Sequence, residues 1–407
     1  MSQTLQDIEG GICAPKGFKA AGVEARIRKP KKDIALIASD IPAAVAAVFT
    51  TNKAAAAPIA VCKAQLQKSR TCSAIVVNSG NANACTGERG LADAWQMVHE
   101  TASALSLPAE SVLVASTGVI GQYLPMERIA EGIRCAAAQL AQSAKASRHA
   151  AEAIMTTDTF PKELAIELKL GEKKVHIGAI AKGSGMIAPQ MATMLAFITT
   201  DAAISPELLQ CALSEANAYS FNRISVDGDC STNDAVLLLA NALAENPRIE
   251  RADSNDYRTF ANALQVVMTR LAKMIVKDGE GATKLIEIHI SGARSESEAE
   301  QAARSIANSL LVKTALHGAD ANWGRIMAAI GYSGIAFEPE KVEISFDDVA
   351  VLKPNFQIEL DEAKAKAVLS KPEVVLHVHL HQGESEVRFW TCDLSAKYVE
   401  INGSYRS

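Results

Sequence analysis

The chain has 407 residues, enough for two or three domains. Hydrophobic residues make up 48% of it and charged residues 21%, values typical of a globular protein. The formal net charge is −5 and the densest basic run is 26–32, so we do not expect nucleic acid as a partner, because phosphate binding needs a larger positive cluster. Apolar runs such as 235–238 are far shorter than the roughly 20 residues that cross a bilayer, so no membrane partner is expected either.

Short β-rich runs and longer amphipathic helices follow one another along the chain, which predicts a mixed α/β fold. Strands are expected at 74–78, 112–115, 175–181, 194–199 and 285–290, and helices at 91–105, 126–155, 206–220 and 255–276. The pattern changes near the loop 279–281. A helix rich in small residues and three strand-like runs then predict a separate C-terminal α+β domain over 283–407; these elements are 295–311, 342–346, 374–380 and 387–392.

The eight cysteines stand singly, and the N-terminal MSQTLQDIEG has acidic residues but no apolar core of a signal peptide. Scattered thiols without an export signal are typical of a reducing compartment. We therefore expect a cytoplasmic protein.

The most informative segment is KGSGMIAPQMATMLAFITT, which runs from Lys182 to Thr200. Its first half contains glycines and a proline, which permit unusual backbone angles, and its second half is an apolar run suited to a buried strand. Thr193 stands at the junction, where a hydroxyl would be held at the head of a rigid element. The pattern alone also fits an ordinary loop that enters a core strand, with Thr193 present for its β-propensity.

A second polar segment, DGDCSTND at 227–234, has the look of a calcium loop. It lacks the glycine at the sixth position, where Thr232 stands, and the glutamate at the twelfth, where Leu238 stands. It therefore predicts a structured polar turn close to the active site rather than a metal site.

The segment around Thr193 resembles the self-cleavage and nucleophile motif of the ornithine acetyltransferase family, also called the bifunctional glutamate N-acetyltransferases of arginine biosynthesis. Gln190 stands where many members carry Asn. Further matches occur in the family's order along nearly the whole chain; they lie at 14–22 (APKGFKAAG), 49–53, 78–83 (NSGNAN), 116–118 (STG), 155–159 (MTTDT), 278–281 (DGEG), 322–325 (NWGR) and 398–402.

The resemblance implies that the chain cuts itself between Ala192 and Thr193. A threonine hydroxyl is a poor nucleophile and needs a base within hydrogen-bond reach. The α-amine that cleavage gives to Thr193 can be that base, because its pKa of ~7.7–8.0 leaves a useful fraction unprotonated near neutral pH. The implied fold is a layered α/β/β/α core of the N-terminal-nucleophile type, with 1–192 as the α chain, 193–282 as the core part of the β chain, and two α with two β chains in the assembly.

The resemblance also assigns site residues. Thr117, through its hydroxyl, and Gly118, through its N–H, would form the oxyanion hole for a tetrahedral intermediate, although the pattern alone fits a strand-ending turn. Lys182 would pair with a substrate carboxylate and Glu280 with an ammonium group. The chain end, NGSYRS, departs from the family's acidic or threonine-bearing endings. The implied substrate-binding set is Thr156, Lys182, Thr193, Glu280, Asn402 and Ser407.

The implied reaction carries the acetyl group of N2-acetylornithine to L-glutamate through an acetyl-Thr193 ester, without metal or other cofactor. Acetyl-CoA is a second possible donor, which would make the enzyme bifunctional. Two alternatives remain at this point. One is an aminopeptidase-like hydrolase on the same self-cleaved scaffold. The other is a metal-dependent hydrolase built on His377, His379 and His381, which alternate along a strand-like run and would share one face.

Overall fold

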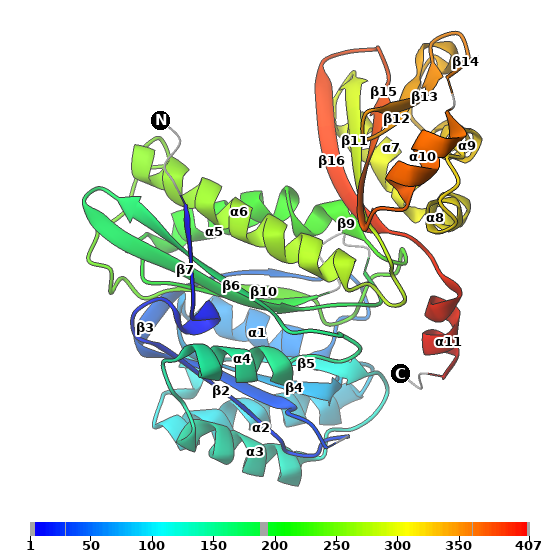
Figure 1. The fold of residues 1–407 in the computed structure, drawn as a ribbon. Helices are drawn as coiled ribbons and strands as arrows, with labels where there is room; N and C mark the ends of the chain where they lie inside the picture. The colour runs from blue at the N-terminus through cyan, green and yellow to red at the C-terminus, as the bar shows by residue number, and fades with distance from the viewer. Residues whose placement is uncertain (1–4, 29, 188–193, 360, 405–407) are drawn as a thin grey trace.

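The structure is a computed structural model that describes residues 5–28, 30–187, 194–359 and 361–404. Within these residues the chain forms a nine-stranded sheet and a seven-stranded sheet, with helices packed on both (Figure 1). The mixed α/β fold predicted from the sequence is confirmed.

The large sheet has the strand order β1-β6-β7-β8-β10-β3-β4-β5, and β2 pairs with β3. Its strands are β1 (Gln6–Ile8), β2 (Phe18–Val23), β3 (Ile34–Phe49), β4 (Thr71–Asn81), β5 (Val112–Val119), β6 (Lys162–Leu170), β7 (Lys173–Lys182), β8 (Leu195–Thr200) and β10 (Ala235–Ala240). The helices packed against it are α1 (Ala57–Lys68), α2 (Gly87–Leu105), α3 (Met126–Ala138), α4 (Ala144–Ala153), α5 (Pro206–Ala218) and α6 (Asn255–Lys277). Short 3-10 turns occur at η1 (Gly11–Cys13), η2 (Ala109–Ser111), η3 (Phe221–Arg223) and η4 (Pro339–Lys341).

Strand β3 is long enough to connect the two halves of the large sheet. Its first residues, 34–38, pair with both β2 and β4, whereas 44–49 pair with β10. The register between β3 and β4 shifts between Ala38 and Ala43, which marks a bulge where the strand bends. One continuous strand therefore joins β2, β4 and β5 to β6, β7, β8 and β10.

Strands β8 and β10 are buried on both faces. They pair in parallel from Leu195 and Ala235 onward. Leu195 and Phe197 face the core that α1 to α4 cover, whereas Ala196 and Ile198 face the core that α5 and α6 cover. A strand with two buried faces reads as a continuous apolar run rather than an alternating one, which explains the sequence 194–199.

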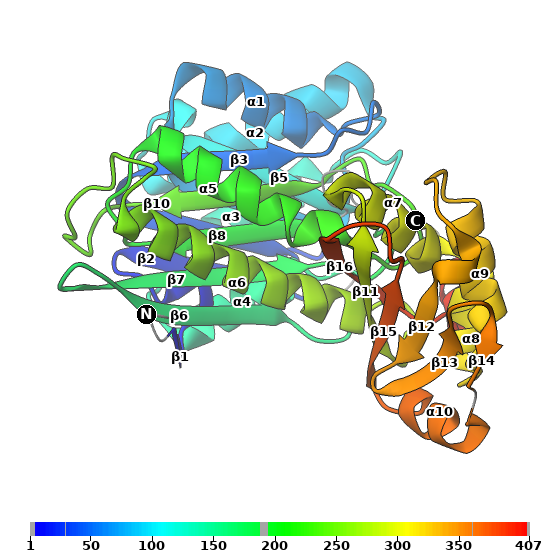
Figure 2. The ribbon, with the colours of Figure 1, turned by 90° about the horizontal axis from the view of Figure 1, so that it is seen from above.

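Helices α5 and α6 lie side by side over one face of the sheet (Figures 1 and 2). Helix α6 begins after Ser254, whose side chain accepts a hydrogen bond from the backbone N–H of Tyr257. Phe260, Leu264 and Val267 recur at helical spacing and are fully buried. The helix is therefore held by its apolar face, and it ends at Lys277 beside the loop that carries Glu280.

Two helices expected to be continuous are each broken. The prediction of one helix over 126–155 is wrong, because α3 ends at Ala138 and α4 begins after Ser143, whose side chain caps Ala146. Between them Ala141 exchanges backbone hydrogen bonds of 3.1 Å with Ala20. The prediction over 295–311 fails in the same way, since Ser309 ends one helix and caps the next.

The second sheet has the order β14-β13-β12-β15-β11-β16-β9. Strand β9 (Ile224–Ser225) comes from the segment before β10 and pairs with β16, so this sheet is bonded to the large-sheet part of the chain. The other strands are β11 (Leu285–Ala293), β12 (Glu343–Phe346), β13 (Val349–Lys353), β14 (Gln357–Ile358), β15 (Glu373–His379) and β16 (Ser385–Cys392). The helices are α7 (Glu296–Asn308), α8 (Leu310–His317), α9 (Trp323–Gly331), α10 (Glu362–Leu369) and α11 (Ala396–Ser404).

None of the helices in the described ranges has both the length and the apolar character that crossing a membrane requires.

Replacing Phe260 by alanine tests the core under α6. We expect Phe260→Ala to lower the free energy of unfolding by about 3–5 kcal/mol, because the side chain is fully buried and its removal leaves a cavity. The measurement is denaturant unfolding. Val266→Ala in the same helix is the control. Because Val266 is 39% exposed, its replacement should lower the free energy of unfolding far less. Equal losses in the two variants would contradict this account of the core.

Candidate active site

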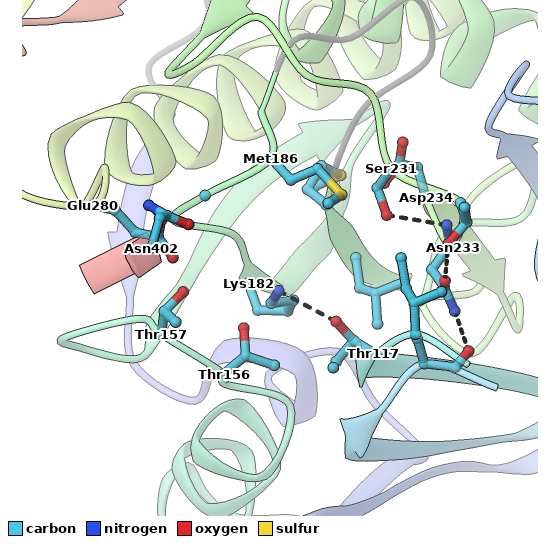
Figure 3. A pocket seen from close by; sticks show the side chains of 17 residues that line it. Thr117, Thr156, Thr157, Lys182, Met186, Ser231, Asn233, Asp234, Glu280 and Asn402 are labelled. Carbon is cyan, nitrogen blue, oxygen red and sulfur yellow. Dashed lines mark hydrogen bonds between the residues drawn. The ribbon is translucent and has the colours of Figure 1, made fainter. Parts of the chain in front are cut away.

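A pocket opens where the ends of β5, β7, β8 and β10 come together (Figure 3). Lys182 is the last residue of β7, Leu195 the first of β8, and Asp234 directly precedes β10. The pocket brings together the predicted site residues that the structure describes, from five separate segments of the chain; they are Thr117, Gly118, Thr156, Lys182, Glu280 and Asn402. Ala192, Thr193 and Ser407 lie outside the described residues.

Thr117 and Gly118 lie near the end of β5, against a bulge in β4. Gly118 has φ +133°, and a Cβ there would lie 2.3 Å from the backbone carbon of Gly80, so only glycine fits this close approach. The Thr117 hydroxyl accepts a hydrogen bond of 3.3 Å from the Lys182 ammonium group. Thr117 is therefore fixed at the pocket wall, with its oxygen facing the cation (Figure 3).

Lys182 is a buried cation, with only 8% of the residue exposed. Burial lowers its pKa, while the nearby carboxylates of Asp158, Asp234 and Glu280 oppose that effect. A buried ammonium group with a carboxylate environment can bind an anionic substrate group strongly, because water screens it little.

Beside Lys182 lies a buried ion network that no motif in the sequence marks. Lys162 donates to Asp158 at 2.7 Å and to Asp278 at 2.5 Å, and all three side chains are at most 1% exposed. Burial opposes ionisation of Asp158, but Lys162 and Lys182 outweigh it and lower its pKa. A carboxylate with a lowered pKa stabilises the fold above its unfolded pKa of about 3.9, and that contribution is lost as the pH falls toward the folded value.

Asp158 also fixes two backbone segments of the pocket. It accepts hydrogen bonds from the N–H of Thr156 at 2.9 Å and from that of Gly183 at 2.7 Å. Asp278 accepts from the hydroxyl and N–H of Thr159 on the same loop. The network therefore holds Thr156 and the end of β7 in fixed relative positions.

Glu280 and Asn402 meet on the side of the pocket opposite Asp234 (Figure 3). The Asn402 side-chain amide donates to Glu280 Oε2 at 2.7 Å, and the Glu280 N–H donates to the carbonyl of Ser184 at 3.0 Å. A Cβ on Gly185 would lie 2.4 Å from the Glu280 carboxylate carbon, so a side chain there would displace that carboxylate from its present position. Helix α11 thus brings a residue near the chain end to the DGEG loop.

The polar turn predicted at 227–234 does lie at the pocket, and two of its side chains order the loops around it. Asp227 accepts the N–H of Met186 at 2.5 Å and that of Ile187 at 2.7 Å. The Asn233 amide donates to the carbonyls of Ala82 at 2.6 Å and Ser116 at 2.8 Å. No motif assigns a role to either residue, although the polar run 227–234 ahead of the apolar β10 is a usable signal.

His377 and His379 lie on the less buried face of β15, as their alternation predicts, and the ring of His381 contacts that of His379 with 4.0 Å between the ring centroids. His381 lies beyond the end of β15 with φ +52°, and it pairs with Glu343 at 3.0 Å. His377 contacts His289, and His379 contacts Ser291. Across the described part of the chain, no cluster of three or more His, Cys, Asp or Glu side chains is arranged to hold a metal ion.

The pocket of this α/β fold contains a buried lysine, several hydroxyl groups, and a glycine at the end of β5. These groups define an enzyme site suited to acyl chemistry on charged substrates. The chain belongs to the ArgJ family, whose model matches residues 19–407. The family predicted from the motifs is thereby confirmed.

Individual relatives agree along the full length. The arginine biosynthesis bifunctional protein of Symbiobacterium thermophilum is 53% identical over 406 residues, which cover 99% of this chain and 100% of the relative. The protein of the same name from Chlorobaculum tepidum is 50% identical, and the match covers 97% of this chain and 96% of the relative. The crystal structure of the Bacillus halodurans protein of the same name is 47% identical with a TM-score of 0.51, and the match covers 52% of this chain and 100% of the solved chain.

Removing the central cation tests the buried network. Lys162→Met should lower the free energy of unfolding by about 3–5 kcal/mol, because it leaves the carboxylates of Asp158 and Asp278 buried without their partner. Denaturant unfolding measures the loss. Lys277→Met breaks the exposed pair with Glu373 and should cost less than about 1 kcal/mol. A Lys162→Met variant as stable as Lys277→Met would show that the network contributes no net stability.

Proposed function

We propose that this transferase of arginine biosynthesis carries the acetyl group of N2-acetylornithine to L-glutamate, with Thr193 as the nucleophile after self-cleavage at Ala192–Thr193. The observation that carries the proposal is that one pocket gathers the six described residues that the family motifs assign, together with Met194, the residue after the nucleophile. Relatives about 50% identical over the whole chain bear the name arginine biosynthesis bifunctional protein, which supports the same conclusion.

Self-cleavage is supported by the relative sizes of solved chains. All of the Bacillus halodurans chain matches, yet it covers only 52% of this chain. Residues 193–407 make up slightly more than half of the 407 residues. A precursor cut between Ala192 and Thr193 would therefore give a β chain that covers about the same fraction of this sequence. In the described strand β8, all residues are buried, so the β chain would stay associated through the core after cleavage.

Cleavage itself needs only a hydroxyl and water. The Thr193 oxygen attacks the carbonyl carbon of Ala192, the C–N bond breaks, and the nitrogen takes the hydroxyl proton. Water then hydrolyses the ester, which leaves a carboxylate on Ala192 and both a hydroxyl and an α-amine on Thr193. The reaction thus makes the base that the hydroxyl needs for the transfer reaction.

Transfer then proceeds in two half-reactions. The Thr193 hydroxyl attacks the acetyl carbonyl carbon of N2-acetylornithine while the α-amine takes the proton, and that proton passes to the departing ornithine nitrogen as the C–N bond breaks. The amine of glutamate next attacks the acetyl ester. Its proton returns through the α-amine to the threonine oxygen, and N-acetylglutamate leaves.

The remaining pocket residues divide by charge. Thr117 and Gly118 would donate to the oxyanion of the tetrahedral intermediate. Lys182, buried and cationic, would bind a substrate carboxylate, and Glu280 with Asn402 would bind an ammonium group. Thr156 and Ser407 complete the proposed set. Both substrates carry a carboxylate and an amine, so a site with both signs of charge fits them.

The proposal extends to the assembly and the donors. Two α and two β chains would form the active heterotetramer in the cytoplasm, and acetyl-CoA would serve as the second donor of a bifunctional enzyme. No metal or other cofactor takes part in the proposed steps. An aminopeptidase-like hydrolase is the weaker alternative, because the family match covers residues 19–407 and its relatives are biosynthetic.

The direct test of the function is the acetyl transfer itself. Purified enzyme is mixed with N2-acetylornithine and glutamate, and N-acetylglutamate and free ornithine are quantified. Thr193→Ala should remain one full-length polypeptide and give no product, because both the attacking oxygen and the α-amine would be missing. Thr193→Ser should retain partial cleavage, since a hydroxyl remains. Cleavage at this bond in Thr193→Ala would exclude the proposed nucleophile.

Loss of one oxyanion donor should slow the chemistry without preventing folding. Thr117→Ala is expected to lower kcat by about 10²-fold or more. Thr101→Ala removes a fully buried threonine hydroxyl from α2, away from the pocket, and should leave kcat near the wild-type value. Equal rates for wild type and Thr117→Ala would remove Thr117 from the mechanism.

A further inference from the structure

A groove outside the active pocket is bounded by α1, the end of β3 and α5 (Figure 2). Its volume is about 580 Å³, which lies within the ~300–1,000 Å³ that small-molecule sites occupy. Three cations line the groove, and no carboxylate stands among the described residues of its lining; the cations are Lys63, Lys68 and Arg70. Because a cleft lined by one sign of charge attracts counter-ions, this groove suits an anionic ligand.

The three cations are exposed, and none forms an ion pair within the part of the chain that the structure describes. Two of them lie near aromatic rings instead. The Lys63 ammonium group is 5.9 Å from the centre of the Phe49 ring, and that of Lys68 is 5.6 Å from the centre of the Trp95 ring. These charges are therefore not neutralised by the protein, although the chain as a whole is acidic, with a net charge of −5.

The floor of the groove is the edge of β3, which a side chain already covers. The amide of Gln210 accepts the N–H of Ala47 at 3.0 Å and donates to the carbonyl of the same residue at 3.1 Å. It thereby takes the place of a neighbouring strand at this edge. At one end of the groove the N–H of Val45 donates to the carbonyl of Arg70 at 3.0 Å. A small anionic molecule therefore fits the groove better than an added strand does.

The loop after β3 connects the groove to the active pocket. The N–H of Thr50 donates to the carbonyl of Asp234 at 2.9 Å, and that of Ala56 donates to the carbonyl of Thr232 at 2.8 Å. Asp234 and Thr232 both line the pocket. Lys53, which belongs to a family motif without an assigned role, is exposed on this loop. A ligand that extends from the groove to the pocket thus passes a fourth cation.

The distance between the groove and the pocket is short. Phe49 pairs with Ala235, which pairs on its other side with Leu195 of the pocket wall. Because neighbouring strands are about 4.7–4.9 Å apart, the backbones of Phe49 and Leu195 lie roughly 10 Å apart. The pantetheine arm of coenzyme A has about as many chain atoms as four peptide residues and spans roughly 13 Å when extended. A thioester on that arm can reach the pocket while the phosphates stay in the groove.

We propose that this groove binds the phosphate groups of coenzyme A when acetyl-CoA serves as the second acetyl donor. The inference rests on the bifunctional activity proposed above. Coenzyme A carries a diphosphate next to its pantetheine arm and a third phosphate on its ribose. Lys63, at the Phe49 end that lies nearer the pocket, binds the diphosphate. Lys68 and Arg70, toward the Val45 end, bind the ribose phosphate through charge-assisted hydrogen bonds.

The first test is titration calorimetry of the purified enzyme with coenzyme A. Lys63→Ala and Arg70→Ala should each weaken binding at least about tenfold, because each removes one charge-assisted contact. Dephospho-coenzyme A lacks the ribose phosphate and should bind the wild type more weakly than coenzyme A does. Arg70→Ala should bind the two molecules about equally, since the partner of that phosphate is gone.

Lys366→Ala is the matched control. Lys366 is also an exposed lysine, but it lies in α10, outside the groove. Its replacement removes the same charge from the protein as Lys63→Ala does. It should bind coenzyme A with the wild-type affinity, because only a charge inside the groove contacts the ligand.

The second test compares the two acetyl donors. In the acetylation of glutamate by acetyl-CoA, Arg70→Ala should raise the KM for acetyl-CoA at least about tenfold with kcat nearly unchanged, because the lost contact binds ground state and transition state alike. The KM for N2-acetylornithine should stay near the wild-type value, since that donor carries no phosphate. The same reaction shows that the variant is folded.

Four results would overturn the inference. They are wild-type affinity for coenzyme A in Arg70→Ala, an equal loss of affinity in Lys366→Ala, an unchanged KM for acetyl-CoA in a variant that no longer binds coenzyme A, and a parallel rise in KM for both donors. A wild-type enzyme that uses N2-acetylornithine but neither binds coenzyme A nor accepts acetyl-CoA would also overturn it, and would leave the transfer from N2-acetylornithine standing. A wild-type enzyme without that transfer would instead refute the proposed function.

Discussion

The parallel pairing of β8 with β10 at the centre of the large sheet is the constraint on which the site depends. Both strands are buried throughout, and their residues pair in unbroken register from Leu195 with Ala235 to Thr200 with Ala240. That register places Asp234 beside Met194, while β7 on the other edge of β8 ends at Lys182. Met194 thus joins the residue at which cleavage is proposed to a strand that is buried throughout.

The chemistry of the pocket follows from burying several charges together. Lys182 and Lys162 are cations, and Asp158 and Asp278 are anions, all with very little solvent contact. Such groups are tolerated only where each has partners, and the partners here come from the MTTDT loop, the end of β7 and the DGEG loop. A network that satisfies buried charges therefore also fixes the loops that carry Thr156 and Glu280. The MTTDT and DGEG loops lie more than a hundred residues apart in the sequence.

Much of the fold could be predicted because its signals are local. The apolar run of β8 and the helical spacing of apolar residues in α6 are both visible in the sequence, and both elements are found within a few residues of the expected ends. The break between α3 and α4 could not be predicted, because the apolar pattern continues across it and the break is set by the pairing of Ala141 with the distant Ala20.

Site residues could be predicted where a family motif contains them. Those whose role depends on tertiary contacts could not. Lys182 and Glu280 stand in recognisable motifs. Lys162, in contrast, stands next to a glutamate in the segment KELAIELKL, where a charged residue is expected to be exposed, and its burial follows from its pairing with the carboxylates of Asp158 and Asp278. Among the residues that the structure describes, Asp234 Oδ2 has no hydrogen-bond partner, which is likewise visible only in the packed structure.

The central claim is that one broken peptide bond supplies the amine that makes a threonine hydroxyl reactive. Its most direct test is mass spectrometry of a catalytically active preparation under denaturing conditions, combined with N-terminal sequencing. The account predicts two polypeptides, the second of which begins Thr-Met-Leu. A single intact chain with full acetyl-transfer activity would contradict it.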